Sequence, residues 1–561
     1  DDSREIVYNL LDNYDQQVTL YEQSVLKHVY KSGVIKTGES RLDHSVNWAK
    51  AILAANVHYL DSDFVPMPCP AEYNFYFTHD VLVTDLAAVN FDLERVKNDL
   101  EFIHAYARPD SVIPHAYYWK DSTYVTEFAG PDNWNHFWFI LAASSYLKHS
   151  GDRQTLETLF PLLCKSITEI QKNITDHLMW AAHPDWWDIG NNKGPRSYMT
   201  ILAIRALREF THIATFLEQN IRKLSYYEKL AAKMQNRLTE VLWDPEMNYL
   251  SNYNRDGVKD KHYYIGSLLA AHFDLLPADK LETLIHTTET KLLDHNLGVY
   301  NAGPMDFHLL RKNYKFHGNE AGAPFVYFNG GIWPQGNAWF ALSLIASGEN
   351  DAAFQFIKNT MSLWGVMNSP NGQPAMYEYR NSNYTDSTIY GKIDKPQFLW
   401  AAGWYLYCVY QLLGVRENEW NVTLQPYLID VSHPTNFDFF VGGEKVQVSV
   451  SGSGKYIKHI KFNGKKYSSV VLPASIAQNT SMDIELGEPE SPYVVKTNSV
   501  LNAVHFDEDE KELNVHLQAF TSHLNQTRIV TPFNPEKILL NGKTLKVKPD
   551  IKNDDGIYLI N

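Results

Sequence analysis

The chain has 561 residues, of which 44% are hydrophobic and 20% charged, which predicts a globular protein of more than one domain. Its 50 Lys and Arg against 65 Asp and Glu give a net charge of −15, which disfavours nucleic acid and anionic membranes as partners. No apolar run approaches the roughly 20 residues that span a bilayer. Cys69, Cys164 and Cys408 match no metal-ligand spacing, so we expect no metal site and no cofactor.

Residues 1–40 are predicted to be a helical lead-in to the first domain. The chain starts without a Met or a signal peptide, which is consistent with removal of a leader or of an upstream segment. Three cysteines give no disulfide framework and leave the compartment undecided, with a periplasmic or secreted location slightly favoured over the cytoplasm. Nothing in the sequence indicates the oligomeric state.

Residues 41–420 are predicted to form a helical domain. From RLDHSVNWAKAILAANVHYL to about residue 415, apolar residues recur three and four positions apart, in about a dozen segments. Helix stops such as HSGD and ASGEN end them, and short turns join them in pairs. Helical hairpins in this number predict a ring, an (α/α)6 barrel. An open helical solenoid is the alternative, although no fixed repeat period is visible.

Residues 421–561 are predicted to be a C-terminal antiparallel β-sandwich. Segments such as KVQVSVSGSG and KELNVHLQAF alternate apolar and polar residues with a period of two. FNGKK and LNGKT are strong signals for hairpin turns. The region contains no cluster of acidic with aromatic residues, so we expect an accessory role.

Polar and aromatic residues concentrate in five loops between the predicted helices, at 70–85, 117–138, 183–198, 327–339 and 370–386. In a ring of hairpins, alternate loops meet at one end of the barrel. The five loops are therefore expected to line a single cleft.

Motifs in four of these loops also have an explanation that needs no function. Asp80 could cap the helix that follows it. Trp333 could be an ordinary hydrophobic anchor, Glu378 a solvated acid, and Asp185 a turn residue after Pro184. No one of these motifs is decisive by itself.

Together, the motifs have the combination of groups that glycoside hydrolysis needs. One carboxylic acid must stay protonated near neutral pH to protonate the leaving oxygen, and apolar surroundings achieve this by raising its pKa. A second carboxylate must act as base or nucleophile. DWWD (185–188) places acids against indole rings, and YEY (377–379) places an acid between phenols. Aromatic faces of this kind stack on sugars.

The order of the motifs resembles the (α/α)6-barrel glycosidases that include processing α-glucosidase I, the trehalases and the glucosidase domain of glycogen-debranching enzyme. FYFTHD resembles their aromatic-Thr/Ser-Arg-Asp motif, and PDWWDIGNN resembles the loop that carries their general acid. FNGGIWPQGNAW resembles their Arg-Gly-Pro-x-Trp-Pro segment, and AMYEYR falls where they carry the base. The helix in PQFLWAAGWYLYCVYQLLG closes the barrel as theirs do.

This resemblance covers residues 40–415 and departs from the family pattern at two positions. His79 stands where Arg is usual, and Asn329 begins the Asn-Gly-Gly that replaces Arg-Gly-Pro. Those positions contact the sugar in the family, so the identity of the sugar stays open. An α-glucoside is the substrate that the resemblance implies.

The resemblance implies that Asp188 is the general acid, with Asp185 as its rival, and that Glu378 is the general base of an inverting hydrolase. The two carboxyl groups are then expected to lie roughly 6.5–9.5 Å apart. We expect Trp187 to stack on the sugar and to exclude water from Asp188. The expected contacts to an oligosaccharide are Asp80, Trp119, Trp134, Trp186, Trp187, Arg196, Trp333, Gln335, Tyr379 and Trp404.

Three other functions stay open. A disaccharide or oligosaccharide phosphorylase would use the same barrel, with phosphate in place of the activated water and a cationic pocket to hold it. Near Glu378 the sequence shows Arg380 but no cluster of Lys and Arg, which favours hydrolysis. A non-catalytic carbohydrate-binding protein would need the aromatic residues without two spaced acids. A polysaccharide lyase would act on an acidic substrate, which the net charge of −15 disfavours.

Overall fold

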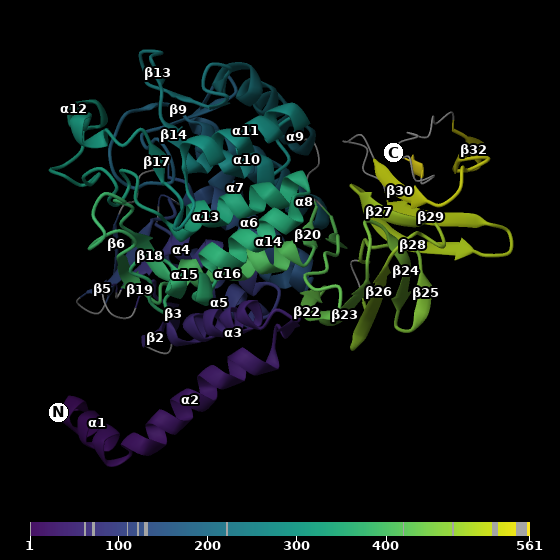
Figure 1. Cartoon of the computed structure of the whole chain (residues 1–561), viewed down its shortest axis with the longest axis horizontal. Coiled ribbons are helices and arrows are strands. Elements are labelled where there is room, and N and C mark those ends of the chain that lie inside the picture. The colour runs from purple at the N-terminus through teal and green to yellow at the C-terminus, as the bar shows by residue number, and fades with distance from the viewer. Residues whose placement is uncertain are drawn as a thin grey trace.

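The computed structural model describes residues 2–60, 63–69, 73, 75–108, 110, 112–120, 123–127, 133–219, 223–418, 420–473, 476–518, 526–545 and 558–560. In this part of the chain every helix ends by Leu412, and every strand longer than five residues comes after it. The helix-rich and strand-rich regions lie side by side (Figure 1). No helix in the described residues is long and apolar enough to cross a membrane.

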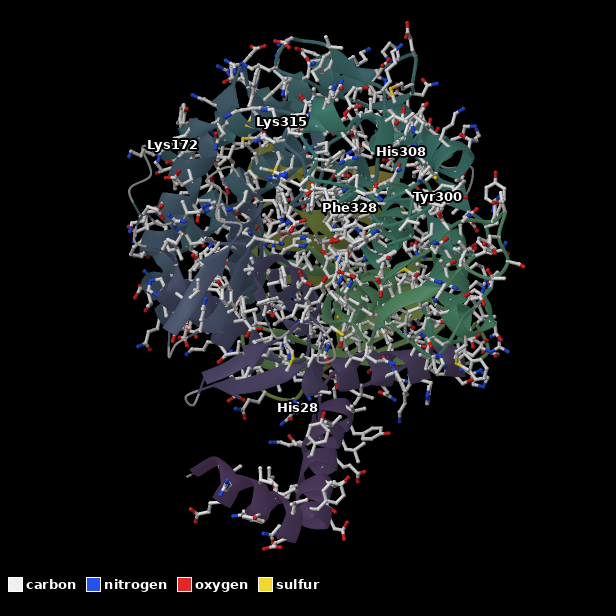
Figure 2. All side chains as sticks on the ribbon, turned by 90° about the vertical axis from the view of Figure 1, so that its left-hand side faces the viewer. His28, Lys172, Tyr300, His308, Lys315 and Phe328 are labelled. Atoms are coloured by element: carbon white, nitrogen blue, oxygen red, sulfur yellow. The ribbon has the colours of Figure 1, made fainter. Side chains whose placement is uncertain are left out.

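The N-terminal residues form an arm that projects from the body of the molecule (Figure 1). It consists of α1 (Asp2–Asp12) and α2 (Tyr14–Lys31), and His28 marks it in Figure 2. After the arm, β1 (Ile35–Lys36) pairs with a strand of the C-terminal sheet. Residues 1–40 thus contain two helices and, in addition, a strand that belongs to the other end of the chain.

The helical region has two sets of helices that alternate along the chain. The largely buried set is α4 (Thr78–Ala88), α6 (Asn135–Ser150), α8 (Ser197–Phe216), α10 (Leu269–His272), α13 (Pro334–Ser347) and α16 (Leu399–Leu412). The other set is α3 (Ser40–Ala55), α5 (Leu93–Tyr106), α7 (Arg153–Lys172), α9 (Leu224–Arg237), α11 (Ala278–Lys291) and α14 (Asn350–Phe356). Each buried helix packs against the next one in the chain, and α16 also packs against α4.

The sequences of the two sets explain their places. All 14 residues of α16 are buried, and none is charged. A helix that is apolar on all sides belongs in the interior of a large protein. By contrast, α7 buries a stripe spaced three and four residues apart, which includes Leu156, Leu159 and Leu163. Close contact between α16 and α4 depends on Gly403, because a Cβ there would lie 2.7 Å from the Cα of Thr84.

Short elements fill the connections between these helices. The strands are β2 (Val57–Leu60), β3 (Asp63–Pro66), β4 (Tyr76–Phe77), β5 (Ala116–Lys120), β6 (Thr123–Glu127), β7 (Ile174–Thr175), β8 (Leu178–Ala181), β9 (Gly194–Pro195), β10 (Trp243–Asp244), β11 (Tyr249–Leu250), β12 (Asn252–Tyr253), β13 (Lys259–Asp260), β14 (Tyr263–Tyr264), β15 (Leu293–Asp294), β16 (Gly298–Val299), β17 (Ala302–Gly303), β18 (Tyr377–Arg380) and β19 (Ile393–Pro396). The short helices are η2 (Leu238–Leu242), η3 (Ile265–Leu268), η4 (Phe307–Leu309), α12 (Arg311–Tyr314), η5 (Ile357–Met361) and α15 (Leu363–Asn368). The hairpins β5–β6 and β18–β19 lie on the side away from the C-terminal region (Figure 1).

The C-terminal region is built from strands. They are β20 (Val415–Glu417), β21 (Val422–Leu424), β22 (Thr435–Val441), β23 (Glu444–Gly452), β24 (Ile457–Phe462), β25 (Lys465–Tyr467), β26 (Thr480–Leu486), β27 (Tyr493–Thr497), β28 (Val500–Asp507), β29 (Glu512–Gln518), β30 (Thr527–Thr531), β31 (Leu539–Leu540), β32 (Lys543–Thr544) and β33 (Tyr558–Ile560). The largest sheet has the order β1-β22-β23-β26-β24-β25. The prediction of a purely antiparallel arrangement is wrong, because β26 enters between β23 and β24 and runs parallel to β23.

The sheet docks on the C-terminal end of α6 through the turn between β22 and β23. The amide of Gly443 donates to the carbonyl oxygen of His149 at 2.8 Å, and the imidazole of His149 lies 2.6 Å from the carbonyl oxygen of Phe440. Tyr410, near the end of α16, donates its hydroxyl to Asp438 in β22 at 3.2 Å. The β-rich region therefore covers one end of the helical region and leaves the other end free.

Candidate active site

The predicted acids lie near the N-terminal ends of the buried helices, at the end away from the C-terminal sheets. Asp80 is in the first turn of α4, Asp188 is on the loop between β8 and β9, and Glu378 is on β18. The charges of Glu378 and Asp188 both raise the pKa of Tyr327, after burial, which has the larger effect. Both charges also raise the pKa of Asp80. Asp80, Asp188 and Glu378, which come from three distant segments, therefore share one site.

Glu378 is held on both of its carboxylate oxygens. Its side chain is buried, with 5% of the residue exposed. Oε1 accepts a hydrogen bond from the hydroxyl of Tyr73 at 3.3 Å, and Oε2 forms an ion pair with Lys395. Burial raises the pKa of Glu378, while the charge and the hydrogen bond of Lys395 oppose that rise. A buried carboxylate with one cation beside it can accept a proton from water.

Asp80 is a buried acid and does not cap its helix. The N-cap of α4 is Phe77, so Asp80 lies at the third helical position. Burial raises the pKa of Asp80 well above its usual range, and the charges of Glu378 and Asp188 raise it further. The raised pKa favours the protonated form of the Asp80 carboxyl group, which can donate a hydrogen bond to a hydroxyl group.

Asp188 is half-buried, and its loop is fixed from behind by two contacts. The carboxylate of Asp185 is fully buried and accepts from the amide of Gly266 at 3.0 Å. The amide of Asn191 donates to the carbonyl oxygen of Tyr314 at 2.5 Å. Burial raises the pKa of Asp185 to about 8. Asp185 therefore anchors the loop, whereas Asp188 acts electrostatically on the other acids of the site.

The two adjacent tryptophans of this loop face different surroundings. The ring of Trp186 packs edge-on against Trp333, with centroids 4.8 Å apart, and lies 5.6 Å from Trp400. Trp187 is fully buried, and its ring stacks on Phe328 at 5.1 Å and meets Phe307 at 5.0 Å. Since no face of Trp187 is exposed, it has no surface on which a sugar could stack. The expectation that Trp187 contacts the substrate is corrected accordingly.

Aromatic rings continue from Trp186 along one wall. Trp333 stacks on Tyr379, with centroids 5.5 Å apart and an interplanar angle of 22°, and on Phe328 at 5.1 Å. Phe328 lies near the middle of the helical region when it is viewed from this end (Figure 2). Trp134 meets His79 and His115 edge-on, and its buried indole nitrogen has no hydrogen-bond partner among the described residues. The wall therefore combines aromatic faces with an unpaired donor.

Gln335 and Trp404 lie deeper, on α13 and α16. The indole of Trp404 donates to Oε1 of Gln335 at 3.3 Å, and the amide nitrogen of Gln335 is buried without a partner in the described part of the chain. Trp404 is 1% exposed and packs against Trp138 and Trp339. Of this pair, only Gln335 offers a free donor.

Arg196 does not belong to the acid site. Its guanidinium is fully buried and donates to the carbonyl oxygens of Ala181 at 3.3 Å and Tyr253 at 3.2 Å. It therefore joins β8 to β12 as a structural side chain, which corrects the expected substrate contact. Trp119, on β5, is also an expected substrate contact, but its side chain lies outside the described part of the structure.

The structure adds five residues to the site that the motifs did not single out: Tyr73, His115, Tyr327, Lys395 and Trp400. Tyr73 and Tyr327 lie within predicted loops, and Trp400 lies in the final helix motif. Lys395 lies outside all five loops, 17 residues after Glu378. Only strand pairing brings it there, so no local pattern could have found it.

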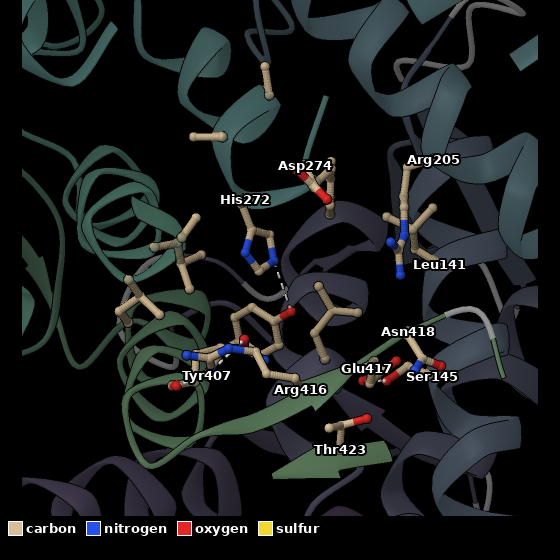
Figure 3. A pocket seen from close by; sticks show the side chains of 18 of the residues that line it. Leu141, Ser145, Arg205, His272, Asp274, Tyr407, Arg416, Glu417, Asn418 and Thr423 are labelled. Atoms are coloured by element: carbon tan, nitrogen blue, oxygen red, sulfur yellow. Dashed lines mark hydrogen bonds between the residues drawn. The ribbon is translucent and has the colours of Figure 1, made fainter. Parts of the chain in front are cut away.

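A cavity of about 350 Å³ lies at the other end of the buried helices (Figure 3). Its polar side chains bind one another. His272 hydrogen-bonds to Tyr407 at 3.1 Å, Arg205 pairs with Glu209, and Arg416 donates to the carbonyl oxygen of Gln411 at the end of α16. Arg416 thereby offsets the negative C-terminal end of α16. The cavity is separate from the acid site, and the bonding of its walls is explained by the fold.

The described residues contain no group of three or more His, Cys, Asp or Glu side chains that could hold a metal ion. The acid site itself offers carboxylates, a lysine and phenolic hydroxyl groups, lined by aromatic rings. Two or three carboxyl groups in such surroundings suit acid–base catalysis on a sugar.

Comparisons with solved structures support the fold. A chain from Thermus thermophilus, described as an uncharacterized conserved protein, superposes with a TM-score of 0.50 at 14% identity, over 65% of this chain and 99% of its own length. The GH78 family rhamnosidase of Bacillus sp. GL1 superposes with a TM-score of 0.52 at 14% identity, over 74% of this chain and 41% of its own. A sialidase gives a TM-score of 0.57 at 11% identity, over 75% of this chain and 39% of its own.

No curated protein matches the sequence. A family model does match, over residues 89–371, which is half of the chain, and it describes amylo-alpha-1,6-glucosidase. The matched segment includes the loop of Asp188 and the segment of Phe328 and Trp333, whereas Asp80, Glu378 and Tyr379 lie outside it. The earlier resemblance to (α/α)6 glycosidases is confirmed, and the chain belongs to the amylo-alpha-1,6-glucosidase family of glycoside hydrolases.

Proposed function

We propose that the protein is an inverting glycoside hydrolase that cleaves an oligosaccharide, with Asp188 as general acid and Glu378 as general base. The observation that carries this proposal is that the charges of Asp188 and Glu378 act on the same two groups, Asp80 and Tyr327. Two carboxylates that face a shared space from different loops are what inversion needs.

In the proposed reaction, Glu378 takes a proton from a water molecule, and the oxygen of that water attacks the anomeric carbon. Asp188 donates its proton to the glycosidic oxygen as the bond between that oxygen and the anomeric carbon breaks. The water attacks from the face opposite the leaving group, so the two carboxyl groups should lie roughly 6.5–9.5 Å apart. Tyr73 and Lys395 hold the two oxygens of Glu378, which leaves further lone pairs free for the water.

An α-glucoside is the substrate class that we propose, supported by the family match to amylo-alpha-1,6-glucosidase. Tyr379, which is half-buried, offers its ring to a sugar, and Trp333 supports it by packing on it, with Trp186 packing on Trp333 in turn. The carboxyl group of Asp80, whose protonated form burial favours, and the amide nitrogen of Gln335, which has no partner in the described residues, offer hydrogen-bond donors. Asn329 is fully buried and donates to Gly322 at 3.1 Å, so it shapes the loop that precedes Trp333.

We also propose that residues 41–420 form a closed (α/α)6 toroid and that residues 421–561 form a β-sandwich accessory domain. The packing of each buried helix on the next, and of α16 on α4, supports closure of the ring. A small second core of Val471, Val494 and Leu501 among the C-terminal strands supports packing between sheets. The strand β1 is a contribution of the N-terminal segment to this domain.

Hydrolysis fits the site better than phosphorolysis. Arg380, the arginine nearest to Glu378 in the sequence, is buried and donates to the carbonyl oxygens of Gly391 at 2.8 Å and Pro370 at 2.7 Å. Its guanidinium is therefore not free to bind phosphate. Lys395 is engaged by Glu378. A phosphorylase has no need of a base, whereas here Lys395 forms an ion pair with Glu378, the proposed base.

The proposal is tested by assaying Asp188→Asn and Glu378→Gln on aryl α-glucosides and α-linked oligosaccharides, with and without phosphate. General acid and general base each contribute about 10²- to 10⁴-fold, so each variant should lose activity by that factor while keeping the wild-type melting temperature. Asp256→Asn, at an exposed turn, is the matched control and should keep full activity. Full activity in Glu378→Gln would overturn the assignment of the base, and products that require phosphate would overturn hydrolysis.

A further inference from the structure

Lys395 reaches Glu378 across a two-stranded hairpin. In the pairing of β18 with β19, Tyr377 is opposite Pro396 and Tyr379 is opposite Asp394. Glu378 and Lys395 lie between these pairs, so they face each other directly. The ammonium group forms an ion pair with Oε2 of the carboxylate. The contact is therefore fixed by strand register rather than by a flexible surface side chain.

Two further features fix the side chain of Lys395. Its ammonium lies 5.2 Å from the ring centroid of Tyr73 and 5.9 Å from that of Tyr379, so the cation lies between two aromatic rings. Its backbone has a φ of 43°, in the left-handed region that non-glycine residues rarely adopt. Such backbone conformations persist where the surrounding structure holds them, often at functional sites.

The groups that face this ion pair come from several segments and are mostly acids or phenols. They are Tyr73, Asp80, Tyr327, Tyr379 and Asp394, and Asp188 acts in turn on Asp80 and Tyr327. Asp394 lies 3.5 Å from the ammonium of Lys395 but is 42% exposed. In the described residues, no second cation is paired with Glu378. Lys395 therefore supplies the positive charge that opposes burial at this carboxylate.

We propose that Lys395 is a positioning residue, which keeps the Glu378 carboxylate ionised and oriented toward the attacking water. The inference rests on the proposed role of Glu378 as general base. Without the ammonium, the buried carboxylate would face only acids and phenols, and it would take up a proton at a higher pH. A protonated Glu378 cannot accept a proton from water. The Glu378 side chain would also lose one of its two fixed contacts.

The test is the pH dependence of kcat and KM in Lys395→Met, which keeps most of the stem and removes the charge. An opposite charge at this range lowers the pKa of an acid by about one to three units. The acidic limb of the kcat/KM profile should therefore move to higher pH by about that amount, with KM changed by less than about threefold. Lys395→Arg should restore the wild-type limb, because its charge can still reach Glu378. Lys392→Met, exposed on the same hairpin connection, should match the wild type.

Three outcomes separate the possibilities. If Lys395→Met lowers the melting temperature but leaves the acidic limb in place, Lys395 is only structural and the inference is wrong. If Lys395→Met does not fold, Lys395→Gln is measured in the same way, and an unmoved limb there overturns the inference equally. If Glu378→Gln itself keeps full activity, the proposed function fails instead, whatever Lys395 does.

Discussion

The two ends of the helical region bury their acids in opposite ways. At the end near Glu378, three acids face one another with Lys395 as the paired cation, and the pKa values of Asp80 and Glu378 are raised. At the end under the C-terminal sheet, Glu209 pairs with Lys148 at 2.8 Å and with Arg205. Burial raises the pKa of Glu209, but these two cations outweigh it and hold the pKa at about 2.

This difference shows that burial alone does not set the charge of an acid. Glu417 repeats the pattern of Glu209: it lies 3.6 Å from Lys148, accepts from Ser145 at 2.6 Å, and has a lowered pKa despite burial. At the end under the C-terminal sheet, the buried acids Glu209 and Glu417 are neutralised by cations. Acids left with too few cations keep proton affinities in the range that catalysis uses.

The largest loss of stability should come from removing the C-terminal region, which covers the end of the helical region where cations neutralise Glu209 and Glu417. Truncation near residue 420 deletes the partner of β1 and the strands that contact His149 and Tyr410, while every acid of the catalytic end remains. We expect no soluble protein, because the ends of α6 and α16 would be uncovered. A stable and fully active fragment of residues 1–420 would show that the C-terminal region does not support the barrel.

Removing one cation from the cluster around Glu209 should lower the free energy of unfolding by less than the truncation does, but still by a large amount. Lys148→Met leaves Glu209 buried without one of its cations, and losing one partner of a buried pair costs about 3–5 kcal/mol. Lys97→Met, which removes exposed ion pairs, should cost about 0–1 kcal/mol. Urea unfolding measures both. Equal, small losses would mean that the Lys148 cluster contributes no more than a surface pair.

Trp187 supports the catalytic loop by packing rather than by contact with sugar. Trp187→Ala should lower the free energy of unfolding by about 3–5 kcal/mol, as for a core tryptophan, and leave the basic limb of the pH–rate profile unmoved. Trp364→Ala, at a residue that is 39% exposed, is the control and should cost much less. A shift of the basic limb to lower pH, with stability preserved, would restore the stacking role expected from the sequence.

The smallest expected effects concern how the free energy of unfolding depends on pH. Asp185 and Glu209 should contribute slopes of opposite sign. The pKa of Asp185 is raised to about 8, so its contribution to stability is present below about 3.8 and is lost as pH rises to about 8. The pKa of Glu209 is lowered to about 2, so its contribution is present above about 4.5 and is lost as pH falls toward 2.

Two variants isolate these slopes. Asp185→Asn should make stability flatter between about pH 4 and 8, and Glu209→Gln should make it flatter below about pH 4.5. Unfolding midpoints measured in urea from acid to mildly alkaline pH give both curves. The same change of slope in both variants would mean that the two buried acids do not differ in charge state.

Much of this arrangement can be predicted from the sequence. Apolar residues three and four positions apart identified helices such as α7, which carries one apolar stripe. The lack of charged residues identified α16 as a buried helix. The motifs singled out Asp80, Asp188 and Glu378. Each lies at or before the start of a buried helix, and the fold brings these helix starts together. Local patterns suffice where function depends on a loop and its helix.

The rest depends on contacts between distant segments. Trp186 and Trp187 are adjacent and chemically identical, but Trp186 is 7% exposed and Trp187 is not exposed at all. Packing against residues distant in the sequence, such as Phe307 on Trp187 and Trp400 on Trp186, sets this difference. Arg196 follows the acid loop, but its guanidinium is turned to backbone carbonyls of Ala181 and Tyr253. Lys395 reaches the site through strand register. Likewise, the parallel pairing of β26 with β23 has no local signature.

The anomeric form of the first product tests the central claim most directly, because it reports how the two carboxylates act on the sugar. Proton NMR would follow the hydrolysis of an α-glucoside that the enzyme accepts, before mutarotation mixes the anomers. With Asp188 as acid and Glu378 activating water on the opposite face, the β-anomer should appear first. Initial release of the α-anomer would mean retention, and it would contradict the assignment of Glu378 as a base that activates water.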